Sequence, residues 1–194
     1  MSILEIKYRW VDVQSSQGAS YRFPNAATEY MRLKYAGPAL YRWTVRTSTM
    51  NLRALYIGET DDLVRRIRQY LAPGKTQFTN QRLKAYFNEA VGRDERVELQ
   101  RLEFDAFHIN KVEFSTEKLG NTHLRRMLEN LMLVWLHADA APGPPVILNQ
   151  VFRQNLERRK KREGTAAAAL KELGLNEAAI QQVISKSVVR KTSA

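Results

Sequence analysis

The stretch ALYRWTVRTSTMNLRALYIGETDDLVRRI, residues 39–67, decides the fold. It opens with β-branched and aromatic residues, passes through the polar segment RTSTMN, and reaches a second such run that ends in Tyr-Ile-Gly. Two runs of this kind joined by a short polar loop are typical of a β-hairpin. A helix is predicted directly after it, with Thr60 as its N-cap and with Asp61 and Asp62 at the positive end of its dipole.

The spacing of apolar residues predicts further elements on both sides of this stretch. The segment LRRMLENLMLVWL is apolar nearly all round, and a helix with that composition is mostly buried. We expect strands over residues 3–10 and 97–104, a helix over 79–91 with Thr79 as its N-cap, and the buried helix over 121–138.

Changes in composition divide the chain into three segments. Gly37-Pro38 precedes the hairpin, the breaker APGPP follows the buried helix, and a run of basic residues begins at Arg158. We therefore expect an N-terminal lead-in element over residues 1–36, a central domain over 37–152 and a basic helical extension over 153–194.

The charge of the chain indicates its class of partner. It carries 31 Lys and Arg against 20 Asp and Glu, a net charge of +11, which favours nucleic acid. An acidic membrane surface fits less well, because there is no lipidation signal and no strongly amphipathic basic helix at either end. Because no apolar run is long enough for a membrane span or a signal peptide, we expect a cytoplasmic protein. The absence of cysteine excludes disulfides and thiolate metal sites.

The three arginines of LVRRIRQYL are not equivalent. On a helical wheel, Arg65 and Arg68 lie outside the apolar arc, as residues of a solvated face do, whereas Arg66 lies at its border beside Tyr70. Two interpretations of Arg66 stay open: a structural ion pair with Asp62 one turn earlier, or a guanidinium that binds a phosphate.

Glu129 is an acidic residue in the middle of the apolar helix. An ionised carboxylate is rarely buried unless it is paired or binds a metal. Arg125, one turn earlier, is the candidate partner for an ion pair. A single carboxylate ligand instead suits a hard cation that keeps most of its waters, which means Mg2+ or Mn2+.

Five elements in this order resemble the GIY-YIG nucleases. The resemblance covers roughly residues 37–150 and includes the predicted strand or helix around each residue. Its elements are Ala39-Leu40-Tyr41, Tyr56-Ile57-Gly58, Arg66 eight residues after that glycine, Glu129 on an apolar helix, and Asn149 in ILNQ.

The resemblance implies a mixed α/β (α+β) domain with a central three-stranded antiparallel sheet flanked by helices. It further implies that Tyr41 or Tyr56 orients or deprotonates the attacking water, that Arg66 stabilises charge on the scissile phosphate, and that Tyr70 helps to bind the phosphate or the leaving oxygen. For the tyrosines, ordinary cross-strand packing is the alternative.

The resemblance also assigns Glu129 as the single protein ligand of one Mg2+ or Mn2+ ion, a Lewis acid on the phosphodiester, with Asn149 as a supporting residue. Two departures from the family pattern lie in or beside its motifs. The first motif is Ala-Leu-Tyr rather than Gly-Ile-Tyr, and Glu59 stands where the repair branch has lysine.

Basic residues outside this set are candidate contacts to the DNA backbone, with a solvated charged face as the alternative. The candidates are Arg65, Arg68, Arg82, Lys84, Arg158, Arg159, Lys160 and Lys161.

The sequence thus predicts a Mg2+-dependent endonuclease acting on double-stranded DNA. A restriction-type enzyme fits the short chain best, and pairing as a homodimer on DNA would let it cut both strands. The alternatives are a nuclease of repair or of a mobile element, and a DNA-binding protein that has lost catalysis.

Overall fold

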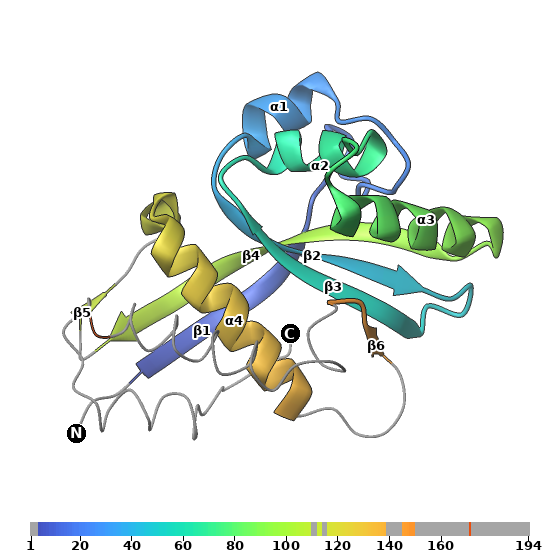
Figure 1. Cartoon of the computed structure of the whole chain (residues 1–194). Coiled ribbons are helices and arrows are strands. Elements are labelled where there is room, and N and C mark those ends of the chain that lie inside the picture. Colours follow the sequence, from blue (N-terminus) through green and yellow to red (C-terminus); the bar gives the residue numbers. More distant parts are fainter. Residues whose placement is uncertain (1–3, 110–111, 114–115, 139–144, 150–170, 172–194) are drawn as a thin grey trace. The chain divides into compact units, whose positions relative to one another are not determined.

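A computed structural model describes residues 4–109, 112–113, 116–138, 145–149 and 171 (Figure 1). The chain divides into two compact units, each described here by itself. Unit 1 comprises Met1–Trp10, Leu102–Ala141 and Gln150–Ala194, and unit 2 comprises Val11–Arg101 and Pro142–Asn149.

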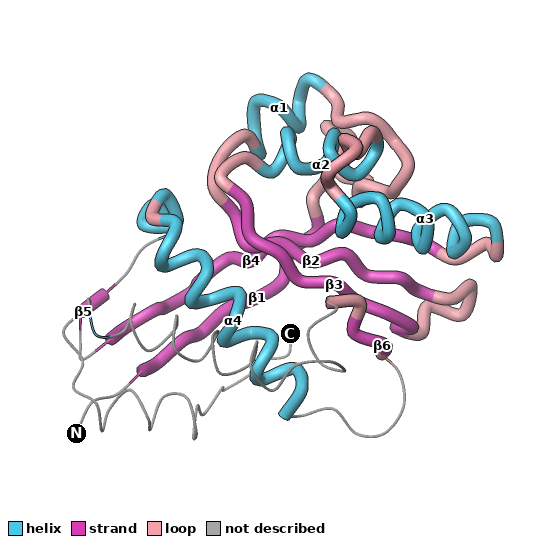
Figure 2. Tube along the Cα trace, in the orientation of Figure 1, coloured by secondary structure: helices cyan, strands magenta, loops and turns pink. Residues whose placement is uncertain are grey.

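The predicted hairpin forms the centre of unit 2. Strands β2 (Ala39–Arg46) and β3 (Leu52–Thr60) are antiparallel, and β2 also pairs antiparallel with the first half of β4 (Arg96–Ile109). On the other side of β3, the short strand β6 (Val146–Ile147) runs parallel to it. The three central strands predicted from the sequence are therefore neighbours in one sheet (Figure 2).

The expectation of a three-stranded sheet is wrong, because the sheet has six strands. Their order is β1-β4-β2-β3-β6, with β1 at Leu4–Asp12, and β5 (Val112–Glu113) pairs with β4. The N-terminal strand predicted over residues 3–10 thus belongs to the sheet itself. The α+β class is confirmed.

Three helices cover one face of the strands of unit 2: α1 (Glu29–Tyr35), α2 (Leu63–Leu71) and α3 (Phe78–Gly92) (Figure 1). Side chains from all three pack with alternate residues of β2 and β3 around the fully buried Trp43. The sequence did not predict α1, whose N-cap is Thr28.

Both predicted N-caps are wrong. Thr60 still belongs to β3, where it pairs with Ala39, and the N-cap of α2 is Asp62, whose carboxylate accepts from the Arg65 amide at 2.9 Å. Thr60 instead stabilises the turn, since its hydroxyl bonds both backbone groups of Asp62. Thr79 lies inside α3, which begins at Phe78 after Gln77.

In unit 1, helix α4 (Thr122–Ala138) confirms the predicted helix and follows the 3-10 helix η1 (Thr116–Gly120). Its apolar residues from Leu124 to Leu133 are buried, as expected. No helix in the described part of the chain is long and apolar enough to cross a membrane. The helical extension predicted over residues 153–194 lies outside the described residues, apart from residue 171.

Candidate active site

Three tyrosines from three elements meet in unit 2. Tyr41 comes from β2, Tyr56 from β3 and Tyr70 from the last turn of α2. The centroids of their rings stand 6.3–6.4 Å apart pairwise, and the hydroxyls of Tyr41 and Tyr70 share a hydrogen bond of 2.8 Å. The two motif tyrosines therefore pack on the same face of the sheet, together with a third tyrosine from the helix.

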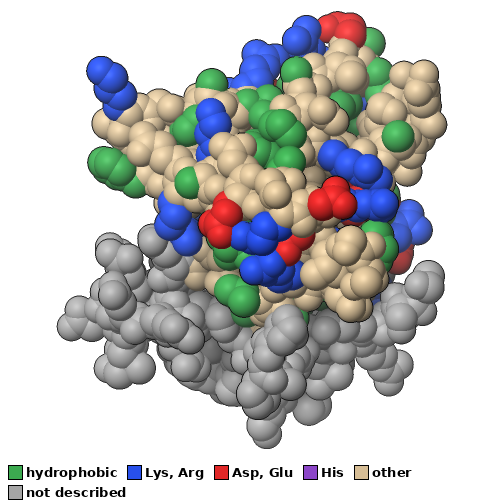
Figure 3. Space-filling view, turned by 90° about the vertical axis from the view of Figure 1, so that its right-hand side faces the viewer, with side chains coloured by type: hydrophobic (Ala, Val, Ile, Leu, Met, Phe, Trp, Pro, Cys, Tyr) green, Lys and Arg blue, Asp and Glu red, His purple; other side chains and the backbone are tan. Residues whose placement is uncertain are grey.

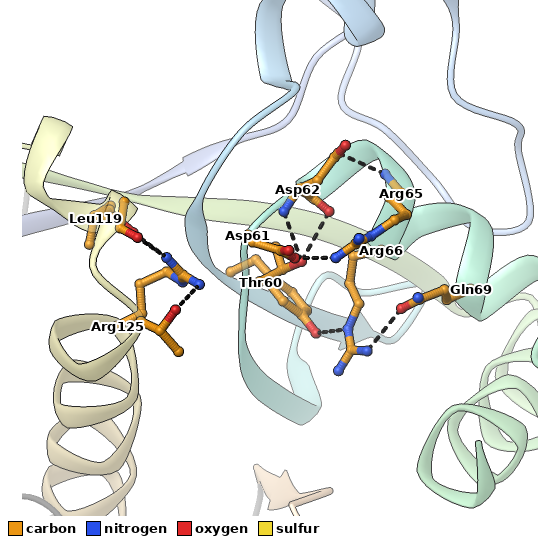
Figure 4. Close-up of polar contacts among 11 residues, drawn as sticks. Thr60, Asp61, Asp62, Arg65, Arg66, Gln69, Leu119 and Arg125 are labelled. Carbon is orange, nitrogen blue, oxygen red and sulfur yellow. Dashed lines mark hydrogen bonds and ion pairs between the residues drawn. The ribbon is translucent and has the colours of Figure 1, made fainter. Parts of the chain in front are cut away.

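Arg66 joins this cluster through its guanidinium. Its Nε donates to the Tyr41 hydroxyl at 2.9 Å, and its Cζ lies 5.5 Å from the centroid of the Tyr70 ring, within the range of a cation–π contact. Of the two interpretations left open by the sequence, the ion pair with Asp62 does not form. Asp62 caps the helix, and the ion pair in this turn joins Arg65 to Asp61 (Figure 4).

Gly58 makes room for this arrangement. It lies opposite Tyr41 in the ladder between β2 and β3, and the strand continues beyond it to Thr60. A Cβ at position 58 would come within 2.5 Å of the Tyr41 hydroxyl oxygen. The glycine of Tyr-Ile-Gly is thus a site of close approach within a strand, not a turn.

Asn149 holds β3 from the other side. Its Oδ1 accepts from the Ile57 amide at 2.9 Å and its Nδ2 donates to the Ile57 carbonyl at 2.7 Å, so one buried side chain satisfies both backbone groups. Ile57 stands between Tyr56 and Gly58. Asn149 therefore fixes the backbone of the Tyr-Ile-Gly motif.

Burial sets the protonation of the cluster. Tyr41 is 0% exposed and Tyr70 is 1% exposed, and burial raises the pKa of both phenols well above the ordinary value, although the nearby Arg66 acts to lower it. Burial disfavours the charge on Arg66, but the oxygens of Tyr41 and Tyr70 outweigh that effect and raise its pKa. At neutral pH the cluster therefore presents neutral phenols beside one cation, an environment that attracts an anion.

Glu129 belongs to unit 1, whereas the tyrosine cluster, Arg66 and Asn149 belong to unit 2. Glu129 is half-buried on α4. Arg125, its candidate ion-pair partner, donates from its guanidinium to the carbonyls of Leu119 and Gly120 at the end of η1 (Figure 4). The Arg125 side chain thus joins α4 to η1.

The donor types bear on the expected metal. Phenols and a guanidinium do not attract a divalent cation, so the tyrosine cluster by itself fits an anion. No group of three or more His, Asp or Glu side chains suited to a metal forms among the described residues. A carboxylate is the donor that Mg2+ prefers, and Glu129 is the residue of the predicted set that supplies one.

The candidate DNA contacts fall into two kinds. Arg65 and Arg68 are exposed on α2, as the helical wheel predicted. Arg82 and Lys84 are half-buried on α3 and donate to backbone carbonyls, Arg82 to Leu148 at 2.7 Å and Lys84 to Leu71 at 2.6 Å. Arg158, Arg159, Lys160 and Lys161 lie outside the described residues.

On the face drawn in Figure 3, basic side chains stand in several groups with acidic ones among them. The charge on this face is therefore mixed rather than uniformly basic.

Sequence reasoning missed Gln69, whose Oε1 accepts from Arg66 Nη1 at 3.0 Å. A signal was present: residues three apart on a helix are neighbours, and Gln69 is three residues after Arg66.

Comparison of the chain with models of protein families, with curated proteins and with solved structures finds no significant match.

Proposed function

We propose that the chain is a divalent-metal-dependent endonuclease of the GIY-YIG type that hydrolyses phosphodiester bonds in double-stranded DNA. One observation carries the proposal. Tyr41, Tyr56 and Arg66, which the sequence resemblance selects from separate elements, form a single cluster in which the arginine bonds a phenol rather than a carboxylate. The net charge of +11 supports a polyanionic substrate.

In the proposed reaction, a water oxygen attacks the phosphorus, the bond from phosphorus to the leaving sugar oxygen breaks, and a proton from the water ends on that leaving oxygen. Negative charge grows on the phosphate oxygens as this happens, and the Arg66 guanidinium stabilises it because it is already held in place. Tyr41 and Tyr70 are buried, and in this proposal they keep Arg66 in position through a hydrogen bond and a cation–π contact. Tyr56, which is 7% exposed, is the tyrosine that we propose to orient or deprotonate the attacking water.

The proposed metal ligand is Glu129. A bound Mg2+ or Mn2+ would supply Lewis-acid polarisation of the phosphodiester. The carboxylate of Glu129 fits such an ion as a single hard oxygen donor, with water and phosphate oxygens as the remaining ligands.

We propose Arg65 and Arg68 as contacts to the DNA backbone, since both are exposed next to Arg66 in the sequence of α2. The basic run 158–161 is proposed for the same role. We propose that Arg82 and Lys84 contribute less to DNA binding, because their side chains bind carbonyls within the fold. A restriction-type enzyme is the favoured biological role, and a symmetric dimer on DNA accounts for cutting of both strands.

The test is incubation of the purified full chain with supercoiled plasmid and with phage genomic DNA, in magnesium and in chelator. We expect discrete magnesium-dependent fragments. Arg66→Ala and Glu129→Gln are each expected to lower the cleavage rate by roughly 100-fold or more, the effect typical of removing a charge-stabilising group.

Two variants serve as controls. Tyr21→Phe removes a buried phenol in unit 2 whose hydroxyl bonds the Asn25 carbonyl, and Arg32→Ala removes an exposed arginine of α1. Both are expected to cut like the parent chain. Nicked or randomly cut DNA favours the repair or mobile-element role instead. Binding without cleavage in the presence of magnesium contradicts the nuclease proposal.

A further inference from the structure

Gln69 is the second acceptor of the Arg66 guanidinium, and nothing in the proposed reaction uses it. It lies on α2, three residues after Arg66, and it is half-buried. Figure 4 shows its amide oxygen turned toward Arg66, with a hydrogen bond of 3.0 Å from Nη1. The contact is therefore made at the edge of the tyrosine cluster rather than on an open helix surface.

The guanidinium is restrained in three ways. Nε is bonded to Tyr41 at 2.9 Å, Nη1 is bonded to Gln69, and the plane lies near the Tyr70 ring. A guanidinium is planar, so two hydrogen bonds to different nitrogens fix both its position and its rotation. The third nitrogen, Nη2, donates to no acceptor in the described part of the chain. Some polar side-chain atoms there are buried without a partner, but Nη2 is not one of them. Nη2 is consequently not fully buried.

Glutamine has a specific advantage at this position. Its amide oxygen accepts a hydrogen bond without carrying charge, so the guanidinium keeps its full positive charge. A glutamate at the same place would form an ion pair that offsets that charge. An isolated pair three residues apart on a helix stabilises it only slightly, because both side chains must be ordered. Here Tyr41 and Tyr70 already order Arg66, so only Gln69 loses side-chain entropy when the bond forms.

We propose that Gln69 is a positioning residue that sets the orientation of the Arg66 guanidinium and directs Nη2 toward a phosphate oxygen of the substrate. The orientation is a property of the folded chain. The phosphate as its target rests on the proposed nuclease function. The test is designed so that these two parts fail separately.

The first measurement needs no activity. In the 15N-labelled full chain, Arg66→Lys identifies the side-chain resonances of Arg66 by their disappearance. In Gln69→Leu, loss of one hydrogen bond is expected to speed rotation of the Arg66 guanidinium about 2- to 10-fold, the factor that corresponds to about 0.5–1.5 kcal/mol. Gln17→Leu, at an exposed glutamine of a loop, is the matched control and should leave the Arg66 resonances unchanged. An unchanged rotation rate in Gln69→Leu overturns the proposal.

The second measurement is plasmid cleavage. Gln69→Leu is expected to lower kcat about tenfold with little change in KM, and Gln69→Glu to lower it further because the new ion pair offsets the charge of Arg66. In an Arg66→Lys background, Gln69→Leu should cause no additional loss, since the residue acts through the guanidinium. An equal loss in both backgrounds contradicts positioning through Arg66. If the parent chain cuts no DNA but rotation of the Arg66 guanidinium depends on Gln69, the two parts of the proposal separate. The nuclease function is then refuted, and the role of Gln69 in orienting Arg66 is established.

Discussion

Gly58 lies opposite Tyr41 in the ladder between β2 and β3, and the end of the Tyr41 side chain fills the space that a side chain at position 58 would need. A Cβ there would stand 2.5 Å from the hydroxyl oxygen and 2.6 Å from Cζ of Tyr41. The ring has no free space to move into, because it is fully buried and its hydroxyl is bonded to Arg66 and Tyr70. The glycine is therefore a packing requirement of the tyrosine cluster.

Gly58→Ala is expected to destabilise the protein by about 1–3 kcal/mol, the usual range for overpacking in a core. Urea unfolding of the variant measures the change. Gly92→Ala is the matched control, since nothing lies within 4 Å of a Cβ at Gly92, and it should alter stability by less than about 0.5 kcal/mol. Equal stability of the Gly58→Ala variant and the parent would show that the ring does not occupy that space.

Stability should fall in alkaline solution because of the buried phenols. Burial raises the pKa of Tyr41 and Tyr70 in the folded chain, whereas the unfolded phenols keep a pKa of about 10. Below pH 10 the folded and the unfolded chain both hold these protons, so the stability that the buried phenols contribute is fully present. Above pH 10 the unfolded chain releases them first, so the free energy of unfolding falls by up to about 1.4 kcal/mol per pH unit for each tyrosine.

Urea unfolding at several values between pH 9 and pH 11 checks this prediction. Tyr41→Phe removes one of the protons and should give a shallower decline than the parent chain. A parallel decline in the two proteins would mean that Tyr41 titrates at an ordinary pKa in the folded state.

Asn149→Asp should weaken the hold on β3 while it preserves the shape of the side chain. The carboxyl can still accept from the Ile57 amide, but it loses the donor to the Ile57 carbonyl, and an unsatisfied buried group costs about 1–3 kcal/mol. The deficit should shrink as the pH falls toward 4, because protonation of the carboxyl restores a donor. Asn51→Asp, in an exposed turn, controls for the added charge. A deficit that does not depend on pH would contradict this account.

Salt dependence separates the two kinds of basic residue. Each phosphate neutralised contributes about 0.9 to the slope of log affinity against log salt concentration. Arg68→Ala should reduce that slope by about this amount without loss of stability. Arg82→Ala should leave the slope unchanged and lower stability, because its guanidinium bonds the Leu148 carbonyl. If Arg82→Ala instead reduced the slope and left stability unchanged, Arg82 would be a DNA contact, as the sequence predicted. Binding titrations with one duplex at several salt concentrations provide the measurement.

The hairpin, α2 and α4 were predictable because each is specified by a local pattern of apolar residues. The border position of Arg66 was predictable for the same reason, since a helical wheel needs only the sequence of the helix. The places of the remaining strands in the sheet were harder to predict. The sequence 3–10 was assigned a strand, but whether a strand joins a sheet depends on residues far away, and β6 has only two residues.

The details of the site depended on contacts between distant residues. Thr60 and Asp62 are both good N-caps, and the choice between them follows from how far β3 stays paired with β2. The need for glycine at position 58 follows from the position of the Tyr41 ring, which comes from another strand. The carbonyls bound by Arg125, Arg82 and Lys84 leave no trace in sequence patterns, because every residue has a carbonyl.

The amide of Asn149 reaches β3 across 92 residues of chain. A growing polypeptide that has been synthesised only as far as α4 already contains all three tyrosines, Arg66 and Gln69, but it lacks the side chain that fixes the backbone of Ile57. One of the last residues of the central region to be made therefore completes the support of the tyrosine cluster. A chain cut short before residue 149 would retain every residue assigned here to the chemistry and still lack this support.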